Sequence, residues 1–117
     1  MYKGIVIKES LENIDILRNI TITKEDTWKV ENAAPGQAPT WSVVYIEVPE
    51  ENMRELATVL SKAIRPGAWF VDVNNTSTRY VIFKDKIFSY PLSDLTSEKE
   101  AKTYARSIGV PESQLGW

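Results

Sequence analysis

The chain has 117 residues, of which 43% are hydrophobic and 26% charged, and its formal net charge is −2 at pH 7. A chain of this length can bury one core, so we expect a single domain over residues 1–117 with no structural metal, disulfide or cofactor. The absence of cysteine and histidine excludes disulfides and thiolate chemistry and removes the commonest general base and transition-metal ligand. The net charge provides no attraction toward nucleic acid or an anionic membrane.

The sequence also gives no targeting signal. It has neither the basic start and apolar run of a signal peptide nor an apolar run long enough to span a bilayer. We therefore expect a cytoplasmic protein that does not bind membranes.

The first forty residues contain short segments in which apolar and polar residues alternate as they do in strands. Residues 3–8 predict one strand, and residues 20–23 and 27–31 predict a β-hairpin with one exposed face. Residues 32–40 contain two prolines and a glycine, which are typical of irregular chain. We interpret this last segment as a mobile surface loop within the one domain.

The strongest patterns lie between residues 41 and 90. Residues 41–48 predict a strand that is apolar on both faces, which places it in the middle of a sheet. Pro49 then begins a helix with a stripe of apolar residues at spacings of three and four, which ends at the proline and glycine of positions 66 and 67. Further strands are predicted over residues 68–74, 79–83 and 87–90.

A second helix is predicted near the C-terminus. Ser97 and Glu100 have the spacing of a capping box at its start. Gly109 is placed for a left-handed cap at its end, and Pro111 prevents continuation. The apolar stripe between these ends consists of Ala101, Tyr104, Ala105 and Ile108.

These elements predict an α+β domain with a mixed, mostly antiparallel sheet and two main helices packed on one face. The first helix is long enough to act as a crossover that makes its two flanking strands parallel, and the later strands add antiparallel neighbours. From residue 41 onward the order of elements resembles a ferredoxin-like split βαβ arrangement. This analogy of order implies no function.

The most suggestive polar cluster consists of Asp72, Asn74, Thr76 and Arg79. Asp72 interrupts an apolar strand and Arg79 opens the next strand, so these residues meet near one end of the sheet if the two strands pair. The cluster predicts a site for a small polar or anionic ligand, with Arg79 as the charge partner. A cross-strand ion pair or a solvated face explains the same residues.

Large aromatic residues are frequent, and four of them are tryptophans, at positions 28, 41, 69 and 117. Aromatic side chains on a sheet can bind a sugar, a base or a partner protein, although the core is the alternative place for most of these rings. We single out Trp41, Tyr80, Tyr90 and Trp117 as a candidate interaction surface. Trp117 is expected either to be disordered or to dock on its own molecule or a neighbour.

No catalytic motif is present. The neighbouring carboxylates lie at expected helix starts, and the chain has no glycine-rich phosphate loop. The sequence from Asp72 to Thr76 begins like a calcium loop, but Ser77 and Phe83 stand where the glycine and glutamate of that loop are needed, so we expect no metal. Enzymatic activity is disfavoured, while carboxylate, tyrosine or lysine chemistry stays open.

The sequence leaves three hypotheses for function. The first is a small cytoplasmic binding or protein-interaction module that self-associates, for example as a homodimer, because aromatic residues are in surplus and a sheet edge is expected to be exposed. The second is a sensor or enzyme-like domain that holds a small polar or anionic ligand near Asp72, Asn74 and Arg79. The third is single-strand nucleic-acid binding through sheet aromatics, which the net charge disfavours.

Overall fold

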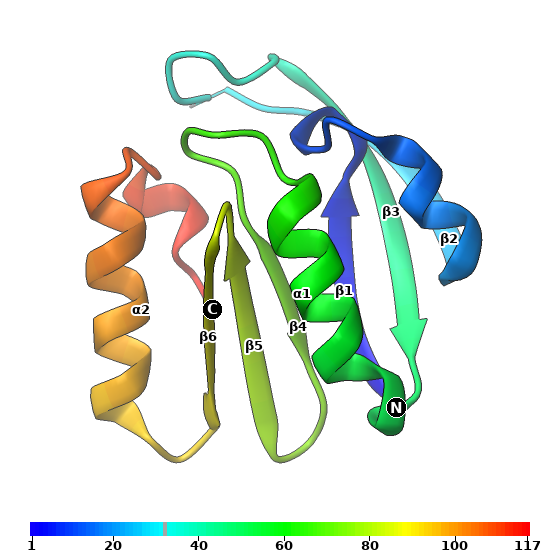
Figure 1. The fold of residues 1–117 in the computed structure, drawn as a ribbon. Helices are drawn as coiled ribbons and strands as arrows, with labels where there is room; N and C mark the ends of the chain where they lie inside the picture. Colours follow the sequence, from blue (N-terminus) through cyan, green and yellow to red (C-terminus); the bar gives the residue numbers. More distant parts are fainter. Residues whose placement is uncertain (32) are drawn as a thin grey trace.

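Six strands form one sheet in a computed structural model of the protein, which describes residues 1–31 and 33–117 (Figure 1). The strands are β1 (Tyr2–Ile7), β2 (Thr21–Lys29), β3 (Thr40–Val48), β4 (Val71–Asn74), β5 (Thr78–Phe83) and β6 (Lys86–Pro91). Their order in the sheet is β2-β3-β1-β4-β5-β6, and each neighbouring pair is antiparallel. With the helices α1 (Met53–Ala63) and α2 (Leu95–Ser107), they form the α+β fold that the sequence predicts.

The first strand of the chain lies in the middle of the sheet. β1 pairs with β3 on one side and with β4 on the other, so that Gly4 faces Ile46 and Val73. β3 and β4, which α1 connects, therefore run in the same direction but are not neighbours. The prediction of a mixed sheet is wrong because an antiparallel strand separates the two strands that the crossover joins. The ferredoxin-like order of elements is not confirmed.

One face of the sheet packs against α1. Pro49 follows β3 and precedes the short 3-10 turn η3 (Glu50–Asn52), after which α1 begins. The buried apolar residues of α1 recur at spacings of three and four and pack on strand residues such as Val6, Val44 and Ile82; they are Met53, Ala57, Leu60 and Ala63. The helix predicted here is therefore confirmed, and its apolar stripe forms one side of the larger core.

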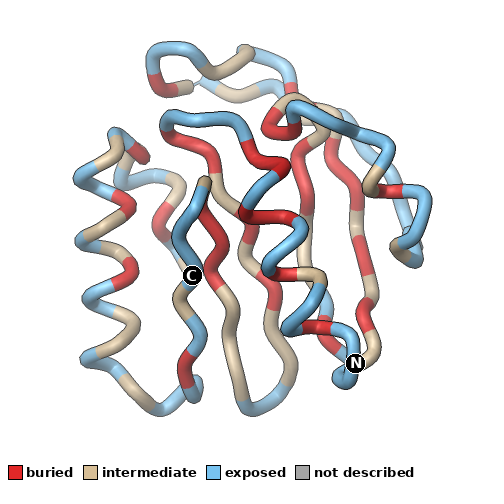
Figure 2. Tube along the Cα trace, viewed as in Figure 1, coloured by how far each residue is buried: buried red, intermediate tan, exposed pale blue. Residues whose placement is uncertain are grey.

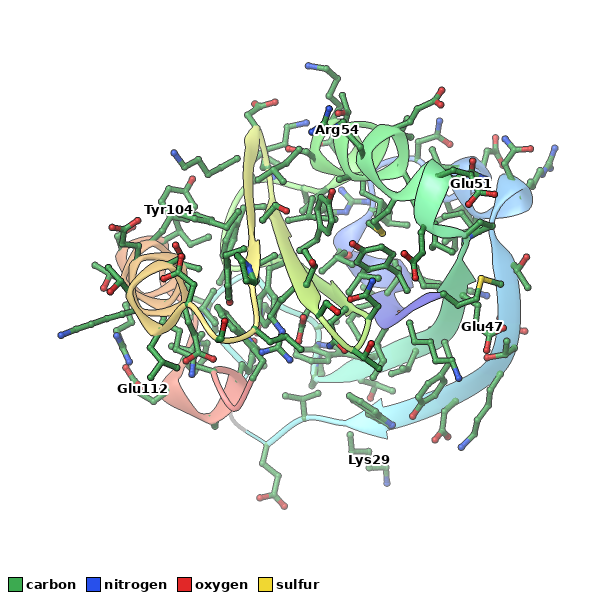
Figure 3. The ribbon with its side chains drawn as sticks, turned by 90° about the horizontal axis from the view of Figure 1, so that it is seen from below. Lys29, Glu47, Glu51, Arg54, Tyr104 and Glu112 are labelled. Carbon is green, nitrogen blue, oxygen red and sulfur yellow. The ribbon has the colours of Figure 1, made fainter. Side chains whose placement is uncertain are left out.

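The second helix covers the opposite face, so the prediction of two helices on one face is wrong. Alternate residues of a strand point to opposite faces. In β5, Ile82 packs in the core that contains α1, whereas Val81 and Phe83 pack with Ala101 and Ala105 of α2. Figure 3 shows α1 and α2 on opposite sides of the strands. Because β5 is apolar on both faces, it needs a covering layer on each side.

The N-terminal region contains one long edge strand in place of the predicted hairpin. β2 runs without a turn from Thr21 to Lys29 and pairs only with β3. Its register shifts between Ile22 and Lys24, which is the mark of a β-bulge. The strand is exposed along nearly its whole length (Figure 2). An exposed strand can carry polar residues throughout, so the polar residues between the two predicted strands do not mark a turn.

The predicted loop over residues 32–40 joins β2 to β3. Asn32 lies outside the described residues. In the described part, the backbone N–H of Ala34 donates to the side-chain oxygen of Gln37, and Nε2 of Gln37 donates to the carbonyl of Ala68. These contacts and the burial of Ala34 anchor residues 33–39 to the chain that precedes β4.

The start of α2 differs from the prediction, whereas its end agrees. Asp94 is the N-cap, since its carboxylate accepts hydrogen bonds from both the backbone N–H and the hydroxyl of Ser97. At the other end Gly109 has a φ of +94°, and the N–H of buried Val110 donates to the carbonyl of Ala105, which confirms the predicted left-handed cap. Within the described ranges, neither helix is long and apolar enough to cross a membrane.

Candidate functional site

A groove lies on the face of the sheet that α1 leaves uncovered. On this face α2 and the C-terminal segment, with Val110 and Leu115, pack over β5 and β6. Figure 3 shows the C-terminal 3-10 turn η4 (Glu112–Gln114) on the side of the strands away from α1, and β2 forms the edge of the sheet beside β3. The groove occupies about 390 Å³, and its lining residues come from the first four strands, the chain before β4 and the C-terminal segment.

All four tryptophans of the chain line this groove. Trp28 on β2 lies opposite Trp41 on β3 in the strand register, and the rings of Trp41 and Trp69 have centroids 5.5 Å apart. The adjacent Phe70 contacts Trp117, with centroids 6.0 Å apart. Trp41 and Trp69 are buried, whereas the other three rings are partly exposed. An aromatic wall thus extends from the edge strand to the C-terminal segment.

Polar side chains in the groove come from alternate positions of two paired strands. In the β1–β4 register Lys3 lies opposite Asn74, and Ile5 lies opposite Asp72. Since alternate residues of a strand share a face, these four side chains all point away from α1. Nζ of Lys3 is 3.6 Å from a carboxylate oxygen of Glu47 on β3. The polar groups therefore stand on rigid strands in the centre of the sheet.

The C-terminal segment forms one wall of the groove. Nε2 of Gln114 donates a hydrogen bond to Oε1 of Gln37, and Nε2 of Gln37 donates to the carbonyl of Ala68. The ammonium group of Lys102 lies 5.3 Å from the centre of the Trp117 ring, close enough for a cation–π attraction. Trp117 is docked on its own chain, which was one of the outcomes expected from the sequence.

Asp72 belongs to a chain of charges that runs from the groove to α2. Its Oδ1 is 3.0 Å from Nε of Arg79, and Nη1 of Arg79 is 3.8 Å from the carboxylate of Glu98, which faces Lys102 at 4.0 Å. The Asp72–Arg79 contact is an ion pair without hydrogen-bond geometry. Burial raises the pKa of Asp72 even though Arg79 opposes the shift, and burial also raises the pKa of Tyr90.

The structure brings together three of the four residues of the predicted polar site. Asp72 and Asn74 line the groove, and Arg79 lies beside Asp72 in the ion pair that the sequence offered as an alternative explanation. Thr76 is exposed in the turn between β4 and β5 and is not part of the groove. Arg79 is also outside the groove lining, so its role there is to hold the Asp72 carboxylate.

The aromatic residues singled out from the sequence do not form one surface. Trp41 and Trp117 line the groove. Tyr80 lies on the α1 face, where its ring contacts Tyr2 with centroids 5.5 Å apart. Tyr90 is buried beneath α2, and its hydroxyl has no hydrogen-bond partner among the described residues.

Sequence reasoning missed several groove residues as site candidates. Trp28 and Trp69 were noted only as members of the aromatic set, and Lys3, Phe70 and Gln114 were not considered. The alternation within each strand places Lys3 and Asp72 correctly on a face, but it does not tell which strands are neighbours. Only the pairing of β1 with β4 brings Lys3 next to the polar cluster.

Neither a cluster of acidic side chains nor a known protein points to a function for the groove. Among the residues that the structure describes, no three acidic side chains are close enough to hold a metal ion. No protein-family model matches the chain, and neither a curated protein nor a solved structure matches it. Any functional argument therefore rests on the site itself.

Proposed function

We propose that the protein is a small-ligand-binding domain and that the aromatic groove is its binding site. The observation that carries this proposal is the convergence of all four tryptophans on one groove that also holds Asp72 and Asn74. Binding sites for small molecules are concave, mostly apolar and furnished with a few polar groups, and they typically occupy roughly 300–1,000 Å³. The groove, at about 390 Å³, fits this description.

The groove is also largely preorganised. Trp41 and Trp69 are buried parts of the core, and Asp72 and Asn74 project from a strand that is hydrogen-bonded on both sides. Side chains that are already ordered lose little conformational entropy when a ligand binds, and this favours affinity. Only the partly exposed rings, such as Trp28 and Trp117, have room to adjust.

Titration of small molecules with tryptophan fluorescence as the readout tests this proposal. A panel of nucleosides, amino acids, sugars and indole derivatives is suitable, with thermal shift as a second readout, because a ligand that binds only folded protein raises the melting temperature. Trp28→Ala removes a groove ring from the edge strand. Ile22→Ala is the matched control, because Ile22 is an exposed apolar residue of the same strand that does not line the groove.

A ligand that loses affinity for Trp28→Ala and keeps it for Ile22→Ala supports the proposal. The proposal fails if the whole panel leaves both readouts unchanged, or if every ligand that binds does so equally well with both variants.

Self-association is a second candidate function, favoured by apolar side chains near α1. Ile16, Ile20, Leu56 and Val59 line a shallow groove between the 3-10 turn η2 (Ile14–Asn19) and α1, and neighbouring Ile14 is exposed. Association through the β2 edge has less support, because the bulge and the charged residues there oppose strand pairing. Analytical ultracentrifugation tests self-association. A homodimer that Val59→Lys dissociates supports self-association through this groove, and a monomer at all concentrations refutes it.

Nucleic-acid binding gains no support from the groove face. Lys3 and Lys24 stand on it with Glu47 and Asp72, and Lys3 is already paired with Glu47. A face with both signs of charge provides little of the counterion release that drives binding to phosphate backbones.

A further inference from the structure

We propose that the ligand of the aromatic groove is a neutral pyranose sugar, as a free saccharide or as part of a glycan. This inference rests on the proposed binding function of the groove and names the class of its ligand. Three features support it: the charge balance of the groove, the arrangement of the rings and the mixture of hydrogen-bonding groups.

The charges that face the groove are already neutralised by the protein. Lys3 is paired with Glu47, and Asp72 is paired with Arg79, whose other side faces Glu98. A charged ligand must either displace one of these partners or leave its own charge unpaired in an aromatic site, and both are unfavourable. An uncharged ligand avoids this cost, so the groove selects against phosphates, carboxylates and ammonium groups.

The two pairs of rings that pack together in the groove, Trp41 with Trp69 and Phe70 with Trp117, do not form a slot for a flat heterocycle. A base sandwiched between two parallel rings needs them roughly 7 Å apart, which is two stacking distances. The rings of Trp41 and Trp69 are inclined at 55° and their centroids are only 5.5 Å apart, so they pack on each other. The groove therefore offers single ring faces and edges. A pyranose suits such surfaces because its C–H bonds carry small positive charges and the face of an indole is negative.

The polar groups of the groove match hydroxyl groups. The carboxylate of Asp72 only accepts hydrogen bonds and the ammonium of Lys3 only donates them, whereas the amides of Asn74 and Gln114 do both. The indole N–H of Trp117 has no partner among the described residues and is buried, so it becomes a further donor only when this partly exposed ring shifts. A hydroxyl group both donates and accepts, so a polyhydroxylated ring can use every member of this set, while an aromatic hydrocarbon can use none.

Calorimetric titration with soluble neutral saccharides tests the inference. The probes are glucose, cellotetraose, maltotetraose, mannotetraose and tetra-N-acetylchitotetraose, with adenosine and indole as probes of other chemistry. We expect saturable binding of at least one saccharide with an affinity that is the same at low and high salt, because no net charge is neutralised. Trp28→Ala and Asp72→Asn should each weaken it about tenfold or more, and Trp28→Phe should restore part of the loss. Ile22→Ala should bind as wild type does.

The outcomes separate this inference from the proposed function. If indole or adenosine binds with sensitivity to Trp28→Ala and no saccharide binds, the groove is a ligand site but the sugar inference is overturned. Saccharide binding that is unchanged in both Trp28→Ala and Asp72→Asn also overturns it, because the sugar then binds elsewhere. If no probe binds at all, the inference fails, and the proposed function fails with it when the amino acids and other nucleosides of the wider panel also leave both readouts unchanged. Circular dichroism of each variant shows that a loss of binding is not a loss of the fold.

Discussion

Replacement of Gly4 by alanine is expected to destabilise the protein at the junction of β1 and β4. A Cβ atom at this position would lie 2.4 Å from the carbonyl oxygen of Asp72 and 2.9 Å from both Cα and Cγ2 of Val73. The nearest obstacle is backbone, so it cannot turn aside as a flexible side chain does. The two strands must separate by about 1 Å before the contact with the Asp72 oxygen reaches 3.4 Å, where ordinary van der Waals contact begins.

The size of the effect follows from this geometry. Forcing a methyl group into a packed site costs about 1–3 kcal/mol, and the lower entropy of unfolded alanine offsets about 0.4–1 kcal/mol of that. The β1–β4 ladder has only three registered pairs, and the clash is at the middle one, so we expect a net loss of about 2 kcal/mol. Such a loss lowers the ratio of folded to unfolded protein about thirtyfold.

Urea denaturation followed by tryptophan fluorescence measures this loss. The midpoint should fall by about 1 M, for a slope of about 2 kcal/mol per molar urea. Gly116→Ala is the matched control, since a Cβ atom there meets nothing within 4 Å, and it should change stability by less than about 0.5 kcal/mol. A Gly4→Ala protein with the midpoint of wild type would show that β1 and β4 are not as close as described.

Three further predictions concern the charged and polar contacts around α2. Asp94→Ala should lower the midpoint of urea denaturation because it removes the N-cap; a larger loss in Ser97→Ala would mean that the cap is misassigned. Arg79→Met should cost about 3 kcal/mol in urea denaturation because Asp72 and Glu98 lose their shared cation, and adding Asp72→Asn should recover part of it. Finally, burial raises the pKa of Asp72 above the ordinary value of 3.8. Asp72 therefore holds its proton more tightly in the folded protein than in the unfolded protein. Its contribution to stability falls as the pH rises from about 3.8 to the raised pKa. Unfolding measured across that pH window should show stability shifting in favour of Asp72→Asn over wild type, and a constant difference would contradict the shift.

Local elements were predictable because their signals are local. The stripe of α1 between Met53 and Ala63, the two-sided apolar pattern of β3 and the β5–β6 hairpin each follow from periodicity over a few residues. The glycine cap at Gly109 follows from one residue type at one position. Where the strand pattern included residues 68–70, the structure begins β4 only at Val71, because β propensity alone does not fix where pairing starts.

The errors concern pairing between distant segments. Nothing in the sequence of β1 indicates that it lies between β3 and β4, since any strand with apolar residues on both faces suits a central place. An apolar stripe shows that α2 packs on a sheet, but it does not tell which face. The alternation of Val81, Ile82 and Phe83 was the usable signal, because a strand that buries both faces requires a layer on each side.

The candidate site was predictable only for those residues that stand out in a local sequence pattern. Asp72 and Asn74 stand out because they are polar within an apolar strand, and they do line the groove. The meeting of Trp28 with Trp41 depends on the β2–β3 register, and the approach of Trp117 to Phe70 depends on the path of the C-terminal segment. Neither is encoded in a local pattern.

The central position of β1 has a consequence for the order of events during synthesis. Lys3 pairs with Glu47 and with Asn74, so at a usual rate of translation β1 is made roughly 4–14 s before its second partner strand. During that interval the apolar run Ile5-Val6-Ile7 has no complete sheet to join. Folds that pair strands far apart in the sequence also fold slowly. The groove is assembled later still, because one of its walls includes Gln114 and Trp117. The candidate site is therefore complete only after all six strands have been made.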